Sequence, residues 1–362
     1  MVLLTAILAC AGGHPDAPTA LSSDGCNAVL GDRVFVAGGW GDGGTLTSLL
    51  ETNGERSTGR ASLPMRLYRP DCVPLGDGRV LLAGGLNKDV ASARSFLYSP
   101  DTDLWEESGS MSTARHQASM LALADGRVLI AGGWSNMIGG KCLKKVELWN
   151  PEAGEWQPQP DLPTCRFEAF PFLRSDGAVA IVAGTTKAAQ DPTAVNKLQG
   201  LAEARSIFIL DSGLQAWSTL DGLERAPAYS EVVPLGGDRV LVAGGLDRVE
   251  NKPVGTSQIL DLKTGESTVT GAMKQGRFNH SLTALAGGDV VAIGGRPEYR
   301  GHVDLGTAER YDASDGLWHP WKTEVPERSA HRSFAVGAQV VIVGCREGDA
   351  CPPVIIPIPR EP

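Results

Sequence analysis

One arrangement of apolar and polar residues recurs along the whole chain. It is clearest at residues 125–134, which read Asp-Gly-Arg-Val-Leu-Ile-Ala-Gly-Gly-Trp. Asp-Gly is typical of a tight hairpin turn, because glycine accepts a positive φ at little cost. The four apolar residues that follow predict a short strand buried on both faces. The glycine pair at its end predicts a close approach of another backbone segment.

Copies of this pattern divide the chain into similar units. They end at residues 39, 85, 133, 184, 245, 295 and 345. A period of about 50 residues indicates a repeat architecture. An apolar stretch precedes each copy and predicts a first strand. A module of two strands around a type I turn follows it, with aromatic residues on both sides, as at residues 97–105, 148–156 and 311–318.

Four strands per unit and this period resemble the kelch repeat of β-propellers. The resemblance covers residues 14–362 and recurs seven times. It implies an all-β, seven-bladed propeller in a single domain, with the glycine pair ending the second strand and the aromatic residues packed between blades. The last unit shows only three strands, so we expect residues 15–21 to supply its fourth strand and close the ring. A six-bladed ring with a degenerate extra unit is the alternative.

The first ten residues predict export. Residues 2–9 are apolar but too few to span a bilayer, which takes about 20. They are typical of the end of a secretory signal. Ile7-Leu8-Ala9-Cys10 resembles a bacterial lipobox, which implies that residues 1–10 are a signal segment and that Cys10 is lipidated. An ordinary secretory signal and a plain N-terminal segment are the alternatives.

Cysteine usage points the same way. Seven cysteines occur, and without Cys10 the remaining six could form three disulfides. Cys345 and Cys351 bracket a short loop. The repeat places Cys26 and Cys72 in neighbouring first strands, and it places Cys142 and Cys165 on the same face. We therefore predict these three pairs and an exported protein: an outer-membrane lipoprotein, or a periplasmic or extracellular one. Free thiols in a cytoplasmic protein are the alternative.

The net charge of the chain restricts the classes of partner that it could bind. The net charge of −9 argues against a nucleic-acid backbone or an anionic membrane surface as the main partner. We expect contact with a membrane only through a lipid anchor at Cys10. We expect a monomer without a cofactor or metal, since the Asp-Gly pairs are interpreted as turns rather than as calcium ligands.

One face of the disc gathers the candidate ligand-binding residues. Strands alternate in direction within a blade, so the link into strand one and the loop between strands two and three share a face. Arginines precede the first strands at positions 69, 115, 166, 225, 277 and 328. They could clamp carboxylate or phosphate groups. We favour the alternative, in which they belong to the repeat and join one blade to the next through backbone carbonyls. The candidate ligand face comprises Arg115, His116, Arg166, Glu168, Tyr229, Arg277 and His280.

The loop of the fourth unit is the longest. It covers residues 185–205 and accounts for the one long spacing between copies. Within it, residues 196–204 could form a short helix. Long loops on regular scaffolds often carry function, although a tolerated insertion is equally compatible with the sequence.

The family resemblance implies two enzymatic alternatives. Kelch-like propellers include copper radical oxidases similar to galactose oxidase, whose site needs two tyrosines, two histidines and a cysteine crosslinked to one tyrosine. The candidates here are Tyr68, Tyr229, His116, His280 and Cys72, which are scattered. A kelch-type sialic acid epimerase would need an acid/base pair, for which Glu168 with Arg166 is the candidate. We favour an extracytoplasmic binding or scaffold protein that presents its loop face to a protein or glycan, and we assign no catalytic residue.

Overall fold

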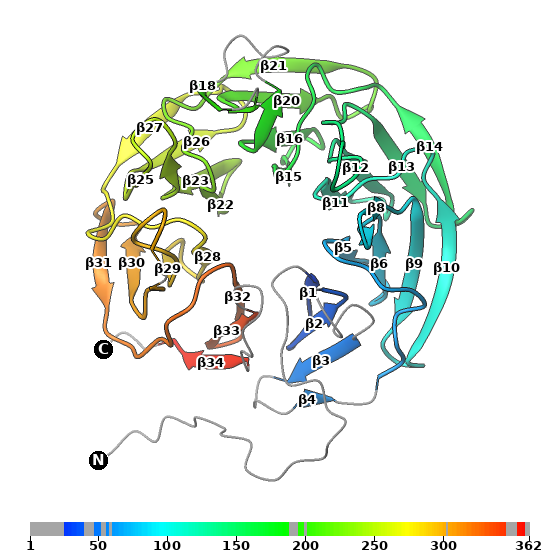
Figure 1. Cartoon of the computed structure of the whole chain (residues 1–362), viewed down its shortest axis with the longest axis horizontal. Coiled ribbons are helices and arrows are strands. Elements are labelled where there is room, and N and C mark those ends of the chain that lie inside the picture. The colour runs from blue at the N-terminus through cyan, green and yellow to red at the C-terminus, as the bar shows by residue number, and fades with distance from the viewer. Residues whose placement is uncertain are drawn as a thin grey trace.

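The computed structural model describes residues 25–39, 47–51, 56–57, 60–187, 195–198, 201–301, 303–344 and 353–358. Seven antiparallel sheets stand radially around a central opening (Figure 1). This arrangement confirms the seven-bladed propeller and excludes the six-bladed alternative. Within the described ranges every regular element is a strand. No helix among those residues is long and apolar enough to cross a membrane.

The blades follow the chain in order, with the first strand of each innermost. Blades one to three consist of β1 (Cys26–Leu30), β2 (Arg33–Ala37), β3 (Thr47–Glu51) and β4 (Arg56–Ser57); β5 (Asp71–Pro74), β6 (Val80–Ala83), β9 (Arg94–Ser99) and β10 (Leu104–Ser110); and β11 (Ser119–Ala122), β12 (Val128–Ala131), β13 (Val146–Asn150) and β14 (Glu155–Gln159). Blades four to seven consist of β15 (Phe170–Leu173), β16 (Val179–Val182), β20 (Ser206–Leu210) and β21 (Trp217–Asp221); β22 (Glu231–Gly236), β23 (Arg239–Ala243), β26 (Ser257–Asp261) and β27 (Ser267–Thr270); β28 (Ser281–Ala284), β29 (Val290–Ile293), β30 (Ala308–Asp312) and β31 (Leu317–Trp321); and β32 (Arg332–Val336), β33 (Gln339–Val343) and β34 (Val354–Pro357).

The second strands form the core. All four residues of β6, β12, β16 and β29 are buried, because each second strand has a neighbouring strand on both edges and a neighbouring blade on both faces. The glycine pair that follows is required by sterics. Gly132 has a φ of 67°, and a Cβ there would lie 2.1 Å from the carbonyl oxygen of Arg166. The next amide, that of Gly133, donates to the same oxygen at 2.7 Å.

Tryptophans of the outer strands join adjacent blades. The indole N–H of Trp105 in blade two donates to Thr47 Oγ1 in blade one at 3.1 Å. The indole of Trp156 in blade three donates to Ser95 Oγ in blade two at 3.0 Å. A buried indole N–H needs such a partner, so each of these bonds sets the register between blades.

Three small sheets rise from the loops between second and third strands. These are the hairpins β7–β8 (Leu86–Asn87, Val90–Ala91) and β24–β25 (Leu246–Asp247, Lys252–Pro253), and the sheet β17–β19–β18 (Thr185–Lys187, Leu201–Glu203, Val195–Leu198). The last of these corrects the helix expected at residues 196–204. Thr185 pairs with Glu203 and Lys187 with Leu201, and Gly200 would weaken a helix by about 1 kcal/mol.

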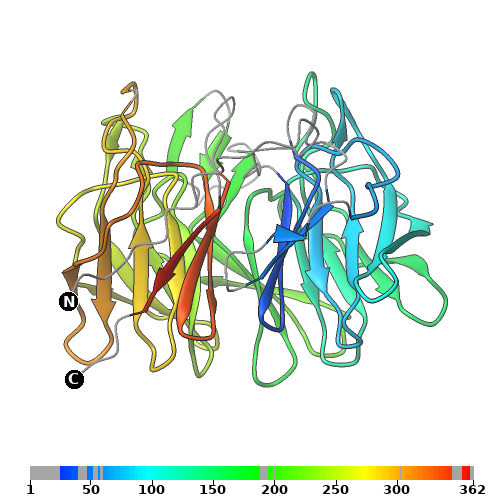
Figure 2. The same ribbon diagram turned by 90° about the horizontal axis from the view of Figure 1, so that it is seen from below.

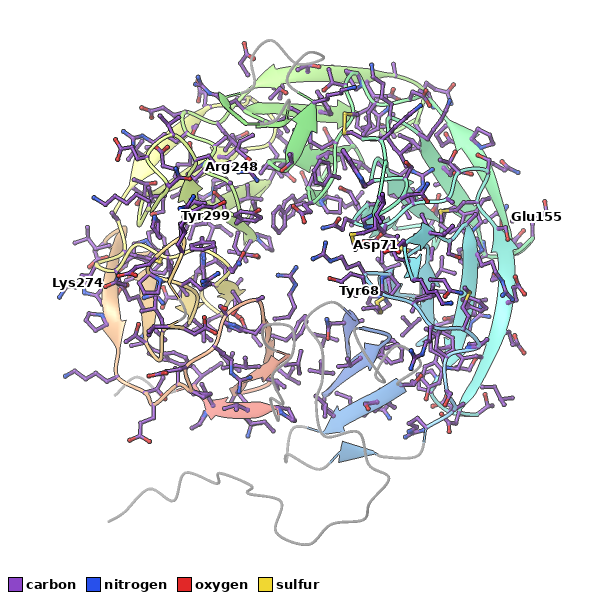
Figure 3. The ribbon with its side chains drawn as sticks, viewed as in Figure 1. Tyr68, Asp71, Glu155, Arg248, Lys274 and Tyr299 are labelled. Carbon is purple, nitrogen blue, oxygen red and sulfur yellow. A yellow bond between two sulfur atoms is a disulfide. The ribbon has the colours of Figure 1, made fainter. Side chains whose placement is uncertain are left out.

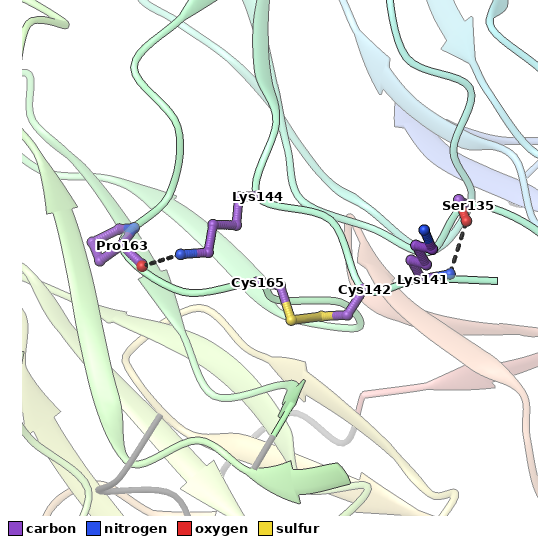
Figure 4. Close-up of a disulfide and its surroundings, with 6 residues drawn as sticks. All are labelled: Ser135, Lys141, Cys142, Lys144, Pro163 and Cys165. Atoms are coloured by element: carbon purple, nitrogen blue, oxygen red, sulfur yellow. Dashed lines mark hydrogen bonds between the residues drawn. A yellow bond between two sulfur atoms is a disulfide. The ribbon is translucent and has the colours of Figure 1, made fainter. Parts of the chain in front are cut away.

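Two of the predicted disulfides are present. Cys26 joins Cys72 between the first strands of blades one and two, and Cys142 joins Cys165 between the blade-three loop and the next blade (Figure 4). Lys144 Nζ donates to the carbonyl of Pro163 at 2.7 Å beside the second bridge. These bridges are consistent with an oxidising compartment. Cys10, Cys345, Cys351 and the closing strand expected at residues 15–21 lie outside the described residues. In the described part of blade seven, β34 is the outermost strand.

Candidate functional site

The central opening contains a cavity of about 790 Å³. Its walls are the first strands and the links and loops on one face of the disc, which is the upper side in Figure 2. We call this side the loop face. Residues from all seven blades contribute to the wall, so the cavity exists only when the ring is closed.

A repeated backbone conformation shapes the mouth of the cavity. One residue just before the first strand of each of blades two to seven has a φ of 52–55°, in the left-handed region. These residues are Arg69, Gln117, Glu168, Tyr229, Asn279 and Ala330. All six line the cavity. A left-handed residue other than glycine costs about 1–2 kcal/mol, and the surrounding structure must hold it in place. Here the amide of Glu168 donates to the carbonyl of Gln117 at 3.0 Å, and Ala330 donates to Asn279 at 2.7 Å.

Aromatic rings form one side of this mouth. The ring centroids of Tyr229 and Phe278 are 6.1 Å apart, and those of Phe278 and Tyr299 are 6.4 Å apart. Arginines flank the row: the Arg248 guanidinium lies 5.3 Å from the Tyr229 centroid, and that of Arg296 lies 5.6 Å from the Phe278 centroid. Tyr229 is 44% exposed, so its ring remains accessible from the cavity. We call Tyr229, Phe278 and Tyr299 the aromatic wall.

A carboxylic acid occupies the opposite side. Asp71 begins β5, and Figure 3 shows Asp71 and Tyr299 on opposite sides of the central opening. Burial raises the pKa of Asp71 to about 7, opposed by a hydrogen bond from the Ala118 amide and by the charge of Arg115. That hydrogen bond to Asp71 Oδ2 measures 3.0 Å. A group with this pKa is partly protonated near neutral pH and can both donate and accept a proton.

Three further carboxyl groups line the same cavity, those of Glu168, Glu203 and Glu231. Burial raises the pKa of Glu203 to about 7, although Arg248 opposes the shift from 3.2 Å. Burial also raises the pKa of Glu231, opposed by Arg332 at 3.3 Å. The negative charge of Glu168 raises the pKa of both. The Gln117 amide donates to the Glu168 carboxylate.

Four of the six predicted arginines join blades. Arg115 is fully buried; it donates to the carbonyls of Gly132 and Lys145 at 2.9 and 2.6 Å and pairs with Glu147 at 2.6 Å. Its own carbonyl accepts from Gly85 of the preceding blade. The equivalent residues Arg166, Arg277 and Arg328 are also buried and bond to the same backbone position in the next blade. In the links into blades two and five this position is occupied by Leu67 and Pro227, so Arg69 and Arg225 do not occupy it.

Arg115, Arg166 and Arg277 are therefore not part of the cavity wall, and the pairing of Glu168 with Arg166 as acid and base has no support in this geometry. Arg69 does line the cavity, at the position of the left-handed residue.

The histidines are buried. His116 is 2% exposed and is not among the cavity-lining residues, whereas His280 lines the cavity but is only 1% exposed. Burial lowers the pKa of His116 to about 4 and that of His280 to about 3, so both are neutral at physiological pH. Cys72 also lines the cavity, but its sulfur is bonded to Cys26.

The structure therefore brings together Glu168, Tyr229 and His280 of the predicted face. Sequence reasoning missed Asp71, Glu203, Glu231, Tyr299 and Arg332. Asp71, Glu231 and Arg332 had a detectable signal, since each is a charged residue in an innermost strand. Glu203 and Tyr299 come from loops that do not repeat.

The only cluster of potential metal ligands that the described residues form is remote from the cavity: Asp312, Asp315 and His319, at the turn between β30 and β31. Two of its residues are exposed, and Asp315 bonds to His319 at 2.9 Å.

Comparisons with known proteins agree with the repeat. Residues 121–163 match the Kelch motif model. A fungal alcohol oxidase of the AA5 family, solved in complex with copper, superposes with a TM-score of 0.70 at 17% identity, covering 96% of this chain and 75% of that one. The protein YjhT superposes with a TM-score of 0.61, also at 17% identity, covering 85% of this chain and 99% of that one. At these identities the two structures show that the fold is shared. The chain is a seven-bladed β-propeller, in which residues 121–163 match the kelch motif.

Proposed function

We propose that this kelch-type propeller is an exported binding protein that takes a carbohydrate into its axial cavity from the loop face. The aromatic wall carries the proposal, because it stands beside carboxyl groups in a cavity large enough for a small sugar. A sugar ring presents apolar C–H groups on its faces and hydroxyl groups on its edge. The C–H groups pack on an aromatic face. The hydroxyl groups lose their hydrogen bonds to water in a closed site, so the protein must supply hydrogen-bonding groups for them.

The charges of the site favour a neutral sugar. Arg248 pairs with Glu203 and Arg332 pairs with Glu231, so the guanidinium groups of these two arginines already have carboxyl partners. Glu168 adds negative charge at the same place. A carboxylated or phosphorylated sugar would meet these acids at close range, whereas neutral hydroxyl groups can donate to them.

The cellular setting is also part of the proposal. The two disulfides support an extracytoplasmic location, and the lipobox-like residues at Cys10 support attachment to a bacterial membrane through a lipid. We propose a monomer, since one ring supplies the whole cavity wall. A protein partner on the loop face is the second type of ligand that the fold could serve.

An enzymatic alternative rests on the pKa values of Asp71 and Glu203. Both acids line the same cavity with pKa values of about 7, so one could remove a proton from a bound sugar while the other supplies one. That is the chemistry of an epimerase or a related carbohydrate-active enzyme.

Copper chemistry is not supported by the residues present. Cys72 is not free to crosslink to a tyrosine, because it is bonded to Cys26, and His116 does not line the cavity.

A ligand panel tests the proposal. The purified chain would be heated with neutral monosaccharides and oligosaccharides, with sialic and uronic acids, and with copper and calcium ions. We expect neutral sugars to raise the melting temperature and Tyr229→Ala to abolish that rise. If only acidic sugars stabilise the chain, the charge argument is wrong. Copper-dependent stabilisation with oxidase activity would replace the binding proposal altogether.

A further inference from the structure

The most exposed large apolar side chains of the described residues lie in one kind of loop. They are Val90, Ile138, Val249 and Val303, with exposed fractions of 65%, 76%, 76% and 65%. Each lies in the loop between the second and third strands, in blades two, three, five and six. Other exposed large apolar residues reach at most 55%. Single exposed apolar residues are normal, but the same position in four different loops is a pattern. We call these four residues the apolar crown.

The crown is not explained by packing of the loops. The blade-two and blade-three loops do contact each other: Met137 donates its amide to Asp89, and the amide of Ala91 donates to the side chain of Asn136 at 3.0 Å. These contacts use backbone and polar groups and leave Val90 and Ile138 outside. They hold the two tips side by side as one raised edge on the loop face (Figure 2).

Each crown residue has an exposed cation close by in sequence. The pairs are Val90 with Lys88, Ile138 with Lys141, Val249 with Lys252 and Val303 with Arg300. Exposed acids at positions 89, 250 and 298 leave the loops close to neutral. The opposite face differs. Its turns between third and fourth strands are mainly acidic, with Asp101, Glu152 and Asp315 exposed. The net charge of −9 is therefore unevenly distributed and does not repel an anionic surface from the loop face.

We propose that the apolar crown inserts into the surface of a lipid bilayer. Separate tips that carry one aliphatic side chain each can reach below the headgroups, where apolar groups leave water, while the cations two or three residues away remain at the level of the lipid phosphates. The same tips would leave gaps against a flat protein surface. Docking in this way turns the acidic face toward solvent and the cavity mouth toward the headgroups. The proposal is independent of carbohydrate binding, because no crown residue lines the cavity.

Vesicle co-sedimentation tests the proposal. The full chain would carry Cys10→Ser, so that no attached lipid can hold it on the membrane. It would be mixed with vesicles of equal parts phosphatidylcholine and phosphatidylglycerol. The test variant is Ile138→Ser with Val249→Ser. The control is Val269→Ser with Leu317→Ser, two aliphatic residues that are 54% and 50% exposed on the outer strands β27 and β31.

We expect the unsubstituted chain and the control to sediment with the vesicles. The crown variant should lose roughly a hundredfold in partition coefficient, about tenfold for each aliphatic side chain removed. Should that variant melt earlier than the control, Val90→Ser with Val303→Ser provides the same test from other blades. Equal binding by the crown and control variants would overturn the proposal. A chain that remains in the supernatant would also overturn it, and a protein partner would then be the explanation for the crown.

Discussion

Glu147→Gln is expected to destabilise the propeller far more than the same substitution at the surface. Glu147 is 1% exposed and pairs with Arg115, which is fully buried. Both carboxylate oxygens now accept from backbone amides: Oε2 accepts from Ser112 at 2.6 Å and Oε1 accepts from Thr113 at 3.3 Å. Glutamine has a single acceptor oxygen, so it can keep only one of these bonds and turns its NH2 group toward the other donor. It leaves the guanidinium without its counter-ion. Removing one partner of a buried ion pair costs about 3–5 kcal/mol, and we expect a loss of free energy of unfolding within this range.

Urea unfolding measures the effect, with Glu107→Gln as the matched control. Glu107 also pairs with an arginine, Arg94, at 2.6 Å, but both side chains are more than 40% exposed. Its loss should hardly move the unfolding midpoint. The double variant Arg115→Leu with Glu147→Leu removes both charges and should recover stability relative to Glu147→Gln, since blade two has Leu67 at the arginine position. Equal midpoints for Glu147→Gln and Glu107→Gln would refute the reasoning.

Three further predictions follow from the cavity, the disulfides and the ring closure. The pKa of Asp71 is raised to about 7, above its value in the unfolded chain. The free energy of unfolding should therefore fall as the pH rises from about 4 to about 7, because the folded state resists ionisation of this carboxyl group. In a profile of melting temperature against pH, Asp71→Asn should flatten this part. Replacing Cys142 and Cys165 with serine should cost about 2–4 kcal/mol in urea unfolding under oxidising conditions and nothing when both chains are reduced. Deleting residues 11–24 should lower the melting temperature and raise hydrogen exchange in β34, because we expect residues 15–21 to pair there; unchanged exchange in β34 would contradict that closure.

The blades could be predicted from sequence because their core is a repeated physical requirement. A run such as Val128–Ala131 can only be stable when buried on both faces, and the glycine after it is the residue that the Arg166 carbonyl tolerates. Seven copies of the same requirement give the number of blades. The role of the four buried arginines also follows from repetition, because the same residue type at the same position in four links is explained by a contact that these links share.

The site could be predicted only in part, because it arises where the repeat is interrupted. Glu168 and Tyr229 were found from their place before a first strand. Glu203 was missed because residues 201–203 form a strand in an insertion rather than a helix, and this strand carries the carboxylate to the cavity. Tyr299 lies in the loop between β29 and β30, which does not follow the repeat, so the sequence pattern does not predict where its side chain lies. The side chains that face one another across the propeller axis come from blades far apart in sequence. The spacing of the repeat does not predict these contacts.

Isothermal titration of the chain with the best neutral sugar from the panel tests the central claim most directly. Tyr229→Ala removes one ring of the aromatic wall, and Leu173→Ala removes an apolar side chain that is 38% exposed and is not among the cavity-lining residues. Binding in the axial cavity predicts at least a tenfold weaker affinity for Tyr229→Ala, equivalent to about 1.4 kcal/mol, and an unchanged affinity for Leu173→Ala. Equal affinities for the unsubstituted chain and Tyr229→Ala would show that the sugar binds elsewhere and would contradict the account.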